Sequence, residues 1–440
     1  MKIALIAMSG IRVCDQELLK LGLTLPGFVE RSKTIASLPS LGLLTLAGMT
    51  DSRHQVDYID VPDLGHWEQL PKDYDLIGIS TYSAQIPEAY DLATRFRELN
   101  VPVVMGGPHV TALPEEALQY CDSVVIGEGE SSWNHLLEDK EAGKLQTRYG
   151  KVNGGFDLSQ SPMPAFSKLD ISKYNRLTVQ TSRGCPHYCE FCASSVIISK
   201  QYHQKPIVNV LAEIDEILKI WAHPFLEFAD DNAMVNKTYW KELLTELKKR
   251  NIRWFAETDL SVSQDEELLK LMKEAGCAQI LMGLESPEKS ALEGVELQSN
   301  WKYTHYEEYR DAIRRIQSFG ITVNGCFILG LDGHTPDIFD KVYDFVKETE
   351  LYEVQITLMT PFPGTPLYER LSRENRLLEP GNWAKCTLFD VNYQPAKMSV
   401  EELEAGFKQL AVSLYEADFT KWRRDRFKER LRDSHHSKGD

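Results

Sequence analysis

The chain has 440 residues, 42% of them apolar and 26% charged, so it is long enough for about two or three folded domains and is neither disordered nor fibrous. Acidic residues outnumber basic residues by 65 to 49, and the net charge of −16 argues against a nucleic acid bound through a broad basic face. No run of about 18 apolar residues is present, so we expect no transmembrane segment and a cytoplasmic location.

Residues 1–150 alternate between apolar strands and amphipathic helices. Apolar runs predict strands at Ile3–Met8, Val56–Ile59, Leu76–Ser80, Val101–Met105 and Val124–Ile126. Between the third and the fourth strand, Pro87–Leu99 carries an apolar stripe with helical spacing. This alternation predicts an α/β, Rossmann-like domain over residues 1–150, in which helices cover both faces of a parallel sheet.

Short polar loops follow three of these strands, at the edge where open parallel sheets bind ligands. The candidate cofactor-binding residues in these loops are Ser80, Thr81, Gly106, Gly107, His109, Thr111, Gly127 and Glu128. Glycine pairs let a backbone approach a ligand closely, although ordinary turns use the same residues. A G-x-G-x-x-G pattern that opens a helix is absent, so a dinucleotide is not predicted.

A second series of strands and helices follows a linker at residues 151–172, which is rich in Gly and Pro. Its predicted strands are Leu177–Thr181, Phe225–Phe228, Arg253–Ala256, Ile280–Met282, Thr322–Ile328 and Val354–Leu358. Residues 173–360 therefore predict a partial (β/α)6 barrel with its reactive groups at the carboxyl ends of the strands. Residues 361–440 predict a small helical C-terminal extension, with a helix at about Val400–Tyr415 and a basic, solvated terminal helix.

The segment with the clearest chemistry runs from Cys185 to Cys192 and has the sequence CPHYCEFC, directly after the first barrel strand. Three thiols at C-x3-C-x2-C spacing are soft ligands that select zinc, copper or an iron–sulfur centre. A structural zinc needs four ligands, and His187, inside the loop, is the candidate for the fourth. A 4Fe–4S cluster held by Cys185, Cys189 and Cys192 keeps one iron open for chemistry, and the loop predicts such a cluster, with zinc as the alternative.

With Phe191 before the third cysteine, the loop resembles that of the radical S-adenosylmethionine (SAM) superfamily, C-x3-C-x-aromatic-C. The resemblance covers nearly the whole chain and implies an enzyme in which the open iron binds the amino and carboxylate groups of SAM. One electron from the cluster then breaks a sulfur–carbon bond. The usual product is a 5′-deoxyadenosyl radical, which abstracts a hydrogen atom from an unreactive C–H bond. An external flavodoxin-like or ferredoxin-like protein is the implied electron donor.

Other residues at the ends of the barrel strands fit this superfamily more loosely. Asp230 or Asp231 would hold the SAM amine, and capping of the following helix is the alternative role. Glu257 and Glu285 are candidates for the ribose or the methionyl group of SAM, with a structural hydrogen bond as the alternative. Gly330 belongs to a turn that resembles the Gly-rich turn near the adenine of SAM.

The first half of the chain resembles the cobalamin-binding class of the superfamily. The segments LPSLGL at 38–43, GGPHVT at 106–111 and GEGE at 127–130 match that class in order and spacing. Residues 390–395, DVNYQP, resemble a subgroup that contains hopanoid methylases. A D-x-H-x-x-G motif, which supplies an imidazole to cobalt in other cobalamin proteins, is absent. Both cobalamin bound without a histidine ligand and a domain that has lost the cofactor are compatible with this absence.

The resemblance as a whole implies a radical SAM enzyme with a 4Fe–4S cluster, SAM and cobalamin as cofactors. The implied reaction is transfer of a methyl group to an unactivated carbon of a small molecule or lipid. The alternative is cobalamin-independent radical SAM chemistry, which includes C–H oxidation, rearrangement and transfer of the 3-amino-3-carboxypropyl group of SAM. The identity of the substrate is not predicted.

Overall fold

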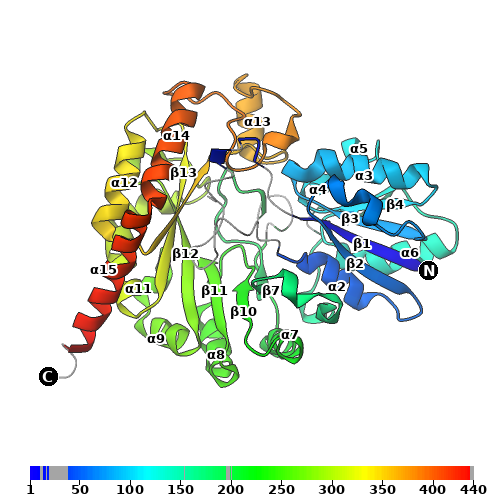
Figure 1. Cartoon of the computed structure of the whole chain (residues 1–440), viewed down its shortest axis with the longest axis horizontal. Coiled ribbons are helices and arrows are strands. Elements are labelled where there is room, and N and C mark those ends of the chain that lie inside the picture. The colour runs from blue at the N-terminus through cyan, green and yellow to red at the C-terminus, as the bar shows by residue number, and fades with distance from the viewer. Residues whose placement is uncertain are drawn as a thin grey trace.

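The computed structural model describes residues 1–9, 13–15, 17–18, 38–152, 154–194, 199 and 201–436. The last four residues of the predicted terminal helix and residue 153 of the predicted linker lie outside these ranges. Two six-stranded parallel sheets stand side by side, the N-terminal one in blue and cyan and the second in green and yellow (Figure 1). Among the helices in these ranges, none combines the length and the apolar surface that crossing a bilayer requires.

The N-terminal sheet has the strand order β2-β1-β3-β4-β5-β6, and neighbouring strands run parallel. Its strands are β1 (Lys2–Met8), β2 (Gln55–Val61), β3 (Leu76–Ser80), β4 (Val103–Gly106), β5 (Ser123–Ile126) and β6 (Arg148–Gly150). The five predicted strands are confirmed, and β6 adds a short edge strand. The order reverses direction between β1 and β3, which places the ligand-binding edge of this sheet beyond the carboxyl ends of those two strands.

Helices cover both faces of this sheet. They are α2 (Leu41–Met49), α3 (Ile86–Glu98), α4 (Pro108–Ala112), α5 (Pro114–Ala117) and α6 (Trp133–Glu141). One face packs Ile6 against Phe96 of α3, and the other packs Leu5 against α2 and against Trp133 of α6. The sequence analysis missed α2 because its residues, LGLLTLAGM, are apolar on almost every side and form no stripe.

The second sheet is the predicted partial barrel, with the order β14-β13-β12-β11-β10-β7 and parallel pairing throughout. Its strands are β7 (Leu177–Val179), β10 (Phe225–Phe228), β11 (Arg253–Thr258), β12 (Cys277–Glu285), β13 (Thr322–Leu329) and β14 (Glu353–Leu358). Its helices are α7 (Ile207–Ile220), α8 (Lys237–Leu247), α9 (Glu266–Glu274), α11 (Tyr309–Ser318) and α12 (Ile338–Thr349). β12 extends beyond the prediction at both ends and shifts register between Gly283 and Glu285.

In each barrel strand, alternate residues point toward the core under the helices and toward the barrel interior. In β11, Trp254 and Ala256 belong to the large apolar core under the helices. Glu257 is on the opposite face, because successive residues of a strand point to opposite sides. The same alternation in β10 buries Leu226 and turns Glu227 toward the interior, where it lines a cavity. The barrel interior is therefore polar at the positions that face the N-terminal half.

The C-terminal extension wraps the barrel with α13 (Pro366–Arg373), α14 (Val400–Tyr415) and α15 (Ala417–His436). The red α15 lies along the outside of the barrel near α11 and α12 (Figure 1). The prediction that its basic residues are solvated is wrong for Arg423, which is 0% exposed and donates to the carbonyl oxygens of Tyr352 and Leu414. Glu353 at the start of β14 is also fully buried, and a buried carboxylate requires cationic neighbours such as Arg424.

Candidate active site

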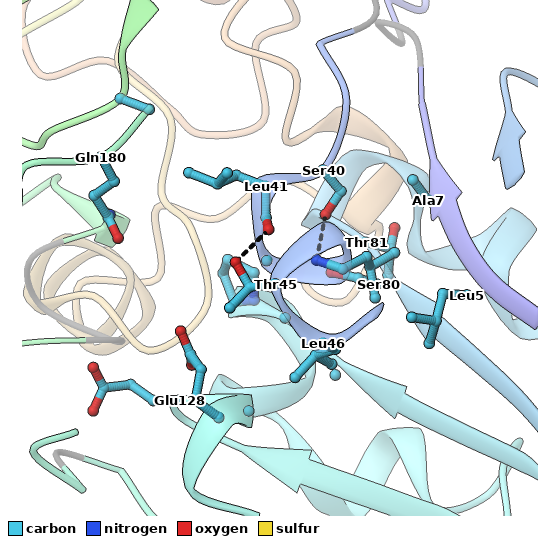
Figure 2. Close-up of a pocket in the computed structure, with 18 of the residues that line it drawn as sticks. Leu5, Ala7, Ser40, Leu41, Thr45, Leu46, Ser80, Thr81, Glu128 and Gln180 are labelled. Atoms are coloured by element: carbon cyan, nitrogen blue, oxygen red, sulfur yellow. Dashed lines mark hydrogen bonds between the residues drawn. The ribbon is translucent and has the colours of Figure 1, made fainter. Parts of the chain in front are cut away.

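A cavity of about 640 Å³ lies where the carboxyl ends of the N-terminal strands face the mouth of the partial barrel. Its N-terminal wall consists of α2 and the loops after β1, β3, β4 and β5. Its barrel wall includes residues at the ends of β7 and β10 and residues that follow the cysteine loop, such as Lys205. Figure 2 shows Gln180 of the barrel across the cavity from Ser40 and Thr81 of the N-terminal half. The cavity is thus at the edge of the sheet where the strand order predicts a ligand.

Six of the eight residues predicted to bind a cofactor in the N-terminal half line this cavity. They are Ser80, Thr81, Gly106, Gly107, Gly127 and Glu128. Gly107 has a φ of 101°, and a Cβ at this position would come within 2.8 Å of the Thr81 carbonyl oxygen. Glycine therefore lets the loops after β3 and β4 touch at the edge of the cavity. Direct contact of these six residues with a cofactor stays a prediction.

The other two residues, His109 and Thr111, do not line the cavity but make hydrogen bonds that fix the loops around it. His109 is buried, with Nδ1 3.0 Å from Ser83 Oγ and Nε2 3.3 Å from Glu116 Oε1, and burial lowers the pKa of its imidazole. Thr111 Oγ1 accepts a hydrogen bond of 3.0 Å from the backbone N–H of Gly127. Neither side chain is among those that line the cavity. Their predicted contact with a cofactor is not tested by this arrangement.

Two further cavity residues were not among the candidates from the sequence. Tyr82, after β3, leaves 67% of its surface exposed although it lines the cavity. Gly42, at the start of α2, also lines the cavity, and a Cβ built on it meets no other atom within 4 Å. An uncovered aromatic ring and an uncovered helix surface suit a large, flat ligand that is partly apolar. Gly42 lies in the 38–43 segment that resembles the cobalamin-binding class, but only the three-dimensional arrangement shows that Gly42 and Tyr82 are uncovered toward the cavity.

The three cysteines predicted to hold the cluster are free thiols in one loop after β7. Burial raises the pKa of Cys185 to about 11 and that of Cys189 to about 12. These thiols therefore lose their protons when a metal binds rather than beforehand, and cluster assembly releases protons. In the described residues, no three His, Cys, Asp or Glu side chains already form a metal-binding group. The assignment of the cysteines rests on their soft donor atoms and their spacing.

A buried carboxylate after β12 holds the cysteine loop in place. Glu296 accepts hydrogen bonds from the backbone N–H groups of Tyr188 at 3.0 Å and Ser299 at 2.7 Å. Burial on its own would raise the pKa of Glu296, but the hydrogen bonds from Ser299 and Tyr188 lower it to about 2. Glu296 is therefore an anion at neutral pH, stabilised by donors of the loop. Sequence analysis missed it because Tyr188 is 108 positions away in the chain.

Asp230 and Asp231 both bind the backbone of the cysteine loop, and Asn236 rather than either of them caps α8. Asp230 is 3% exposed, and its Oδ1 accepts from the N–H groups of Thr181 at 2.7 Å and Ser182 at 2.9 Å. Burial raises the pKa of Asp230 to about 6, although these hydrogen bonds oppose the shift. Asp231 accepts a hydrogen bond of 2.8 Å from the N–H of Gly184 and lines the cavity. Of the two, Asp231 is the one that reaches the cavity.

Glu257 and Glu285 lie at the ends of neighbouring barrel strands in different surroundings. Glu285, with a φ of 61°, is bonded to the ammonium group of Lys302, which also donates to the Gly283 carbonyl oxygen at 2.7 Å. Among the described residues, Glu257 has no hydrogen-bond donor to its carboxylate. Desolvation inside the barrel mouth, together with the charges of Glu227 and other nearby carboxylates, raises the pKa of Glu257 to about 7. Glu257 therefore changes its protonation state near neutral pH, which is typical of functional sites.

Gly330 follows β13 and contacts the C-terminal extension. Its φ is 86°, and a Cβ at this position would overlap the hydroxyl group of Tyr393. That hydroxyl donates a hydrogen bond of 2.7 Å to the Gly330 carbonyl oxygen. The predicted turn near the adenine is therefore fixed from its outer side by the 390–395 segment.

Comparison with known protein families assigns both halves of the chain. Residues 33–137 match the family described as B12 binding domain, and residues 179–346 match the family described as Radical SAM superfamily. Residues 365–439 match a domain of unknown function, DUF4070. The first match covers α2 and the cavity loops after β3, β4 and β5, and the second covers the cysteine loop with β10, β11, β12 and β13.

Similar proteins match this chain over most of its length. An uncharacterized methyltransferase of Pyrococcus horikoshii is 29% identical over 435 residues, covering 91% of this chain and 93% of the relative. The hopanoid C-2 methylase of Rhodopseudomonas palustris is 28% identical, covering 79% of this chain and 67% of the relative. A solved structure of TsrM from Kitasatospora setae shows a radical SAM methyltransferase with cobalamin and a [4Fe-4S] cluster bound. It matches this chain with a TM-score of 0.69 at 16% sequence identity, and the match covers 99% of both chains. The two proteins therefore share the fold.

The strand orders, the cavity shared by both halves and the two family matches agree with one another. The chain therefore carries a radical SAM domain, which follows a B12 binding domain.

Proposed function

We propose that the protein is a cobalamin-dependent radical SAM methylase that transfers a methyl group to an unactivated carbon of a small molecule or lipid. The observation that carries the proposal is the single cavity whose walls come from the B12 binding domain and from the mouth of the radical SAM barrel. A ligand bound at the N-terminal loops and a ligand bound at the barrel mouth would share this space. Methyl transfer between two cofactors and a substrate needs such a shared, enclosed site.

The residues present fit the cofactors that the family implies. Cys185, Cys189 and Cys192 would hold a 4Fe–4S cluster, because three thiolates leave one iron free for SAM. The cavity would hold cobalamin, with the Tyr82 ring and the surface of α2 at Gly42 as its apolar contacts and the loops at Gly107 and Gly127 beside it. When bound, these groups supply the radical and methyl-transfer chemistry, while the protein binds, orients and excludes water.

The polar residues of the barrel mouth would orient SAM and the substrate. Asp231 would accept a hydrogen bond from the SAM amine, since its carboxylate lines the cavity. Glu285, held by Lys302, would bind the ribose or the methionyl group, and the turn at Gly330 would lie near the adenine. Glu257 has a pKa of about 7, so at neutral pH its carboxyl group can hold a proton as a donor or accept one from a ligand.

We further propose a cytoplasmic location and a flavodoxin-like or ferredoxin-like electron donor. The domain boundaries that we propose are 1–150 for the cobalamin-binding half, 151–172 for the linker, 173–360 for the barrel and 361–440 for the extension.

Anaerobic reconstitution with iron, sulfide and hydroxocobalamin tests the function directly. The reconstituted protein should contain about four irons and about one cobalt per chain, as expected for one cluster and one corrin. With SAM and a reductant it should form 5′-deoxyadenosine, and methyl-labelled SAM should transfer its label to the substrate. Methylthioadenosine as the product, or a protein that takes up no corrin, would contradict the proposal. A Cys189→Ala variant should lose iron and SAM cleavage together while it keeps the corrin.

A further inference from the structure

One buried arginine connects the cysteine loop with the N-terminal half. Arg183 ends β8 (Ser182–Arg183), which pairs with β9 (His203–Gln204), so its backbone is fixed just before Cys185. Its side chain crosses to the loop after β5, where Nη1 lies 2.9 Å from Glu128 Oε1 and Nη2 is bonded to Glu130 Oε1. All three side chains line the cavity. The contact therefore spans the boundary between the two family domains at the cavity wall.

The ion pairs of Arg183 are largely withdrawn from solvent. The side chains of Arg183, Glu128 and Glu130 are 17%, 4% and 6% exposed. Burial disfavours the charged guanidinium, but Glu130 and Glu128 outweigh it and raise the pKa of Arg183. Without the guanidinium, two buried carboxylates would face each other unpaired, which is strongly unfavourable.

The same network reaches the linker and a second cavity loop. Glu128 Oε2 accepts a hydrogen bond of 2.7 Å from the backbone N–H of Phe156 in the linker. The backbone N–H of Gly127, next to Glu128, donates to Thr111 Oγ1 in α4 at 3.0 Å. Arg183 therefore ties the cysteine loop to the linker and to the loops after β4 and β5. These loops form the cavity wall opposite the barrel mouth.

We propose that Arg183 is a positioning residue that sets the distance and orientation of the cysteine loop relative to the loops after β4 and β5. Under the proposed function, on which this part of the inference rests, the same bridge fixes the spacing between the cluster and the corrin. The bridge itself rests only on the contacts of the protein. Lysine cannot replace Arg183 fully, because one ammonium group cannot reach both carboxylates with the forked geometry of a guanidinium.

Amide hydrogen exchange of the full-length, ligand-free chain tests the bridge, with the N–H of Phe156 as the reporter. Arg183→Met has similar length and no charge, and it should speed exchange at Phe156 about tenfold or more by allowing local opening. Amides in the middle of β13 should keep their wild-type rates. Arg250→Met is the matched control, because Arg250, just after α8, makes a forked pair with Asp215 of α7 at 2.7 and 2.8 Å on the outer surface of the barrel domain. It should leave exchange at Phe156 unchanged.

Equal exchange at Phe156 in the wild type and in Arg183→Met would overturn the proposal. If Arg183→Met does not fold, Arg183→Lys decides: faster exchange at Phe156 supports the proposal, and a wild-type rate overturns it. In reconstituted Arg183→Lys with full iron and cobalt content, the relaxation of the Co(II) electron spin by the reduced cluster should be weaker than in the wild type. Failure of the wild type to bind a corrin would contradict the proposed function and leave the exchange result unaffected.

Discussion

Gly330 packs directly against the side chain of Tyr393, and this contact leads to a prediction at the scale of single residues. Gly330→Ala would place a methyl group on the Tyr393 hydroxyl in a backbone conformation that only glycine adopts easily. We expect it to lower the free energy of unfolding by about 3 kcal/mol, from steric overlap and backbone strain together. In a Tyr393→Phe background the same change should cost only about 1–2 kcal/mol, because the clashing oxygen is gone. Denaturant unfolding of the four proteins measures the difference, and equal costs in both backgrounds would contradict the contact.

His334 leads to a prediction about acid stability. It is 1% exposed, its Nε2 lies 2.9 Å from Ser286 Oγ, and burial with the nearby charges of Lys341 and Lys397 lowers its pKa to about 3. In the unfolded chain the imidazole binds a proton below about pH 6.5, whereas in the folded chain it stays neutral until about pH 3. Stability is therefore lost as the pH falls below 6.5, by about 1.4 kcal/mol per pH unit from this residue. His334→Gln should remove that part of the slope when unfolding is measured between pH 7.5 and pH 5, and an unchanged slope would contradict the assignment.

Single residues also show how far the sequence could predict the site. The cysteine loop is predictable because its ligands lie within eight positions of one another. The loops after β3, β4 and β5 are predictable because parallel strands place their carboxyl ends together. Glu296, Arg183 and Tyr82 are not, since their roles depend on partners or on a cavity brought close only by the fold.

At the scale of elements, α13 holds the cysteine loop through an ion pair. Arg370 on this helix makes a forked pair with Glu190, between Cys189 and Phe191, at 3.0 and 2.8 Å, and it also contacts Asp332 at 2.6 Å. Arg370→Ala should speed the loss of iron to a chelator about tenfold, since an opening that is easier by about 1.4 kcal/mol corresponds to that factor.

Arg373→Ala is the matched control for this prediction, because Arg373 is on the same helix and donates only to the carbonyl oxygen of Glu369 among the contacts described. Its rate of iron release should equal that of the wild type. Equal rates for Arg370→Ala and Arg373→Ala would show that α13 does not stabilise the loop.

Helices and strands whose apolar residues repeat with a clear period were predicted well, and elements without such a repeat were not. The barrel strands are confirmed because apolar runs bounded by helical patterns are unambiguous at this length. α2 was missed for lack of a polar face, and α15 was expected to be solvated because its sequence is basic. The acidic partners of α15, Glu350 and Glu353, lie far from it in the chain, so its charge alone could not reveal that it packs against the barrel.

At the scale of the whole molecule, a ligand that fills the shared cavity should stabilise the folded chain. Hydroxocobalamin at about 100 times its dissociation constant would add about 2.7 kcal/mol to the free energy of unfolding and raise Tm by several degrees. Gly42→Phe should abolish this shift, because its ring would occupy the space beside α2, whereas Gly42→Ala should retain it. Thermal unfolding with and without the corrin measures both, and an equal shift in Gly42→Phe would place the corrin elsewhere.

The partial barrel leaves β14 at the end of its sheet, and the C-terminal extension covers this edge. The Tyr415 hydroxyl donates to the Val354 carbonyl oxygen at 3.1 Å, and the Leu358 N–H donates to the Leu388 carbonyl oxygen at 2.7 Å. A chain shortened ahead of residue 388 would present uncovered N–H and C=O groups to its surroundings, and such groups recruit strands from other copies. The C-terminal extension therefore protects this edge of the sheet from pairing with other copies of the chain, and a chain without it should aggregate.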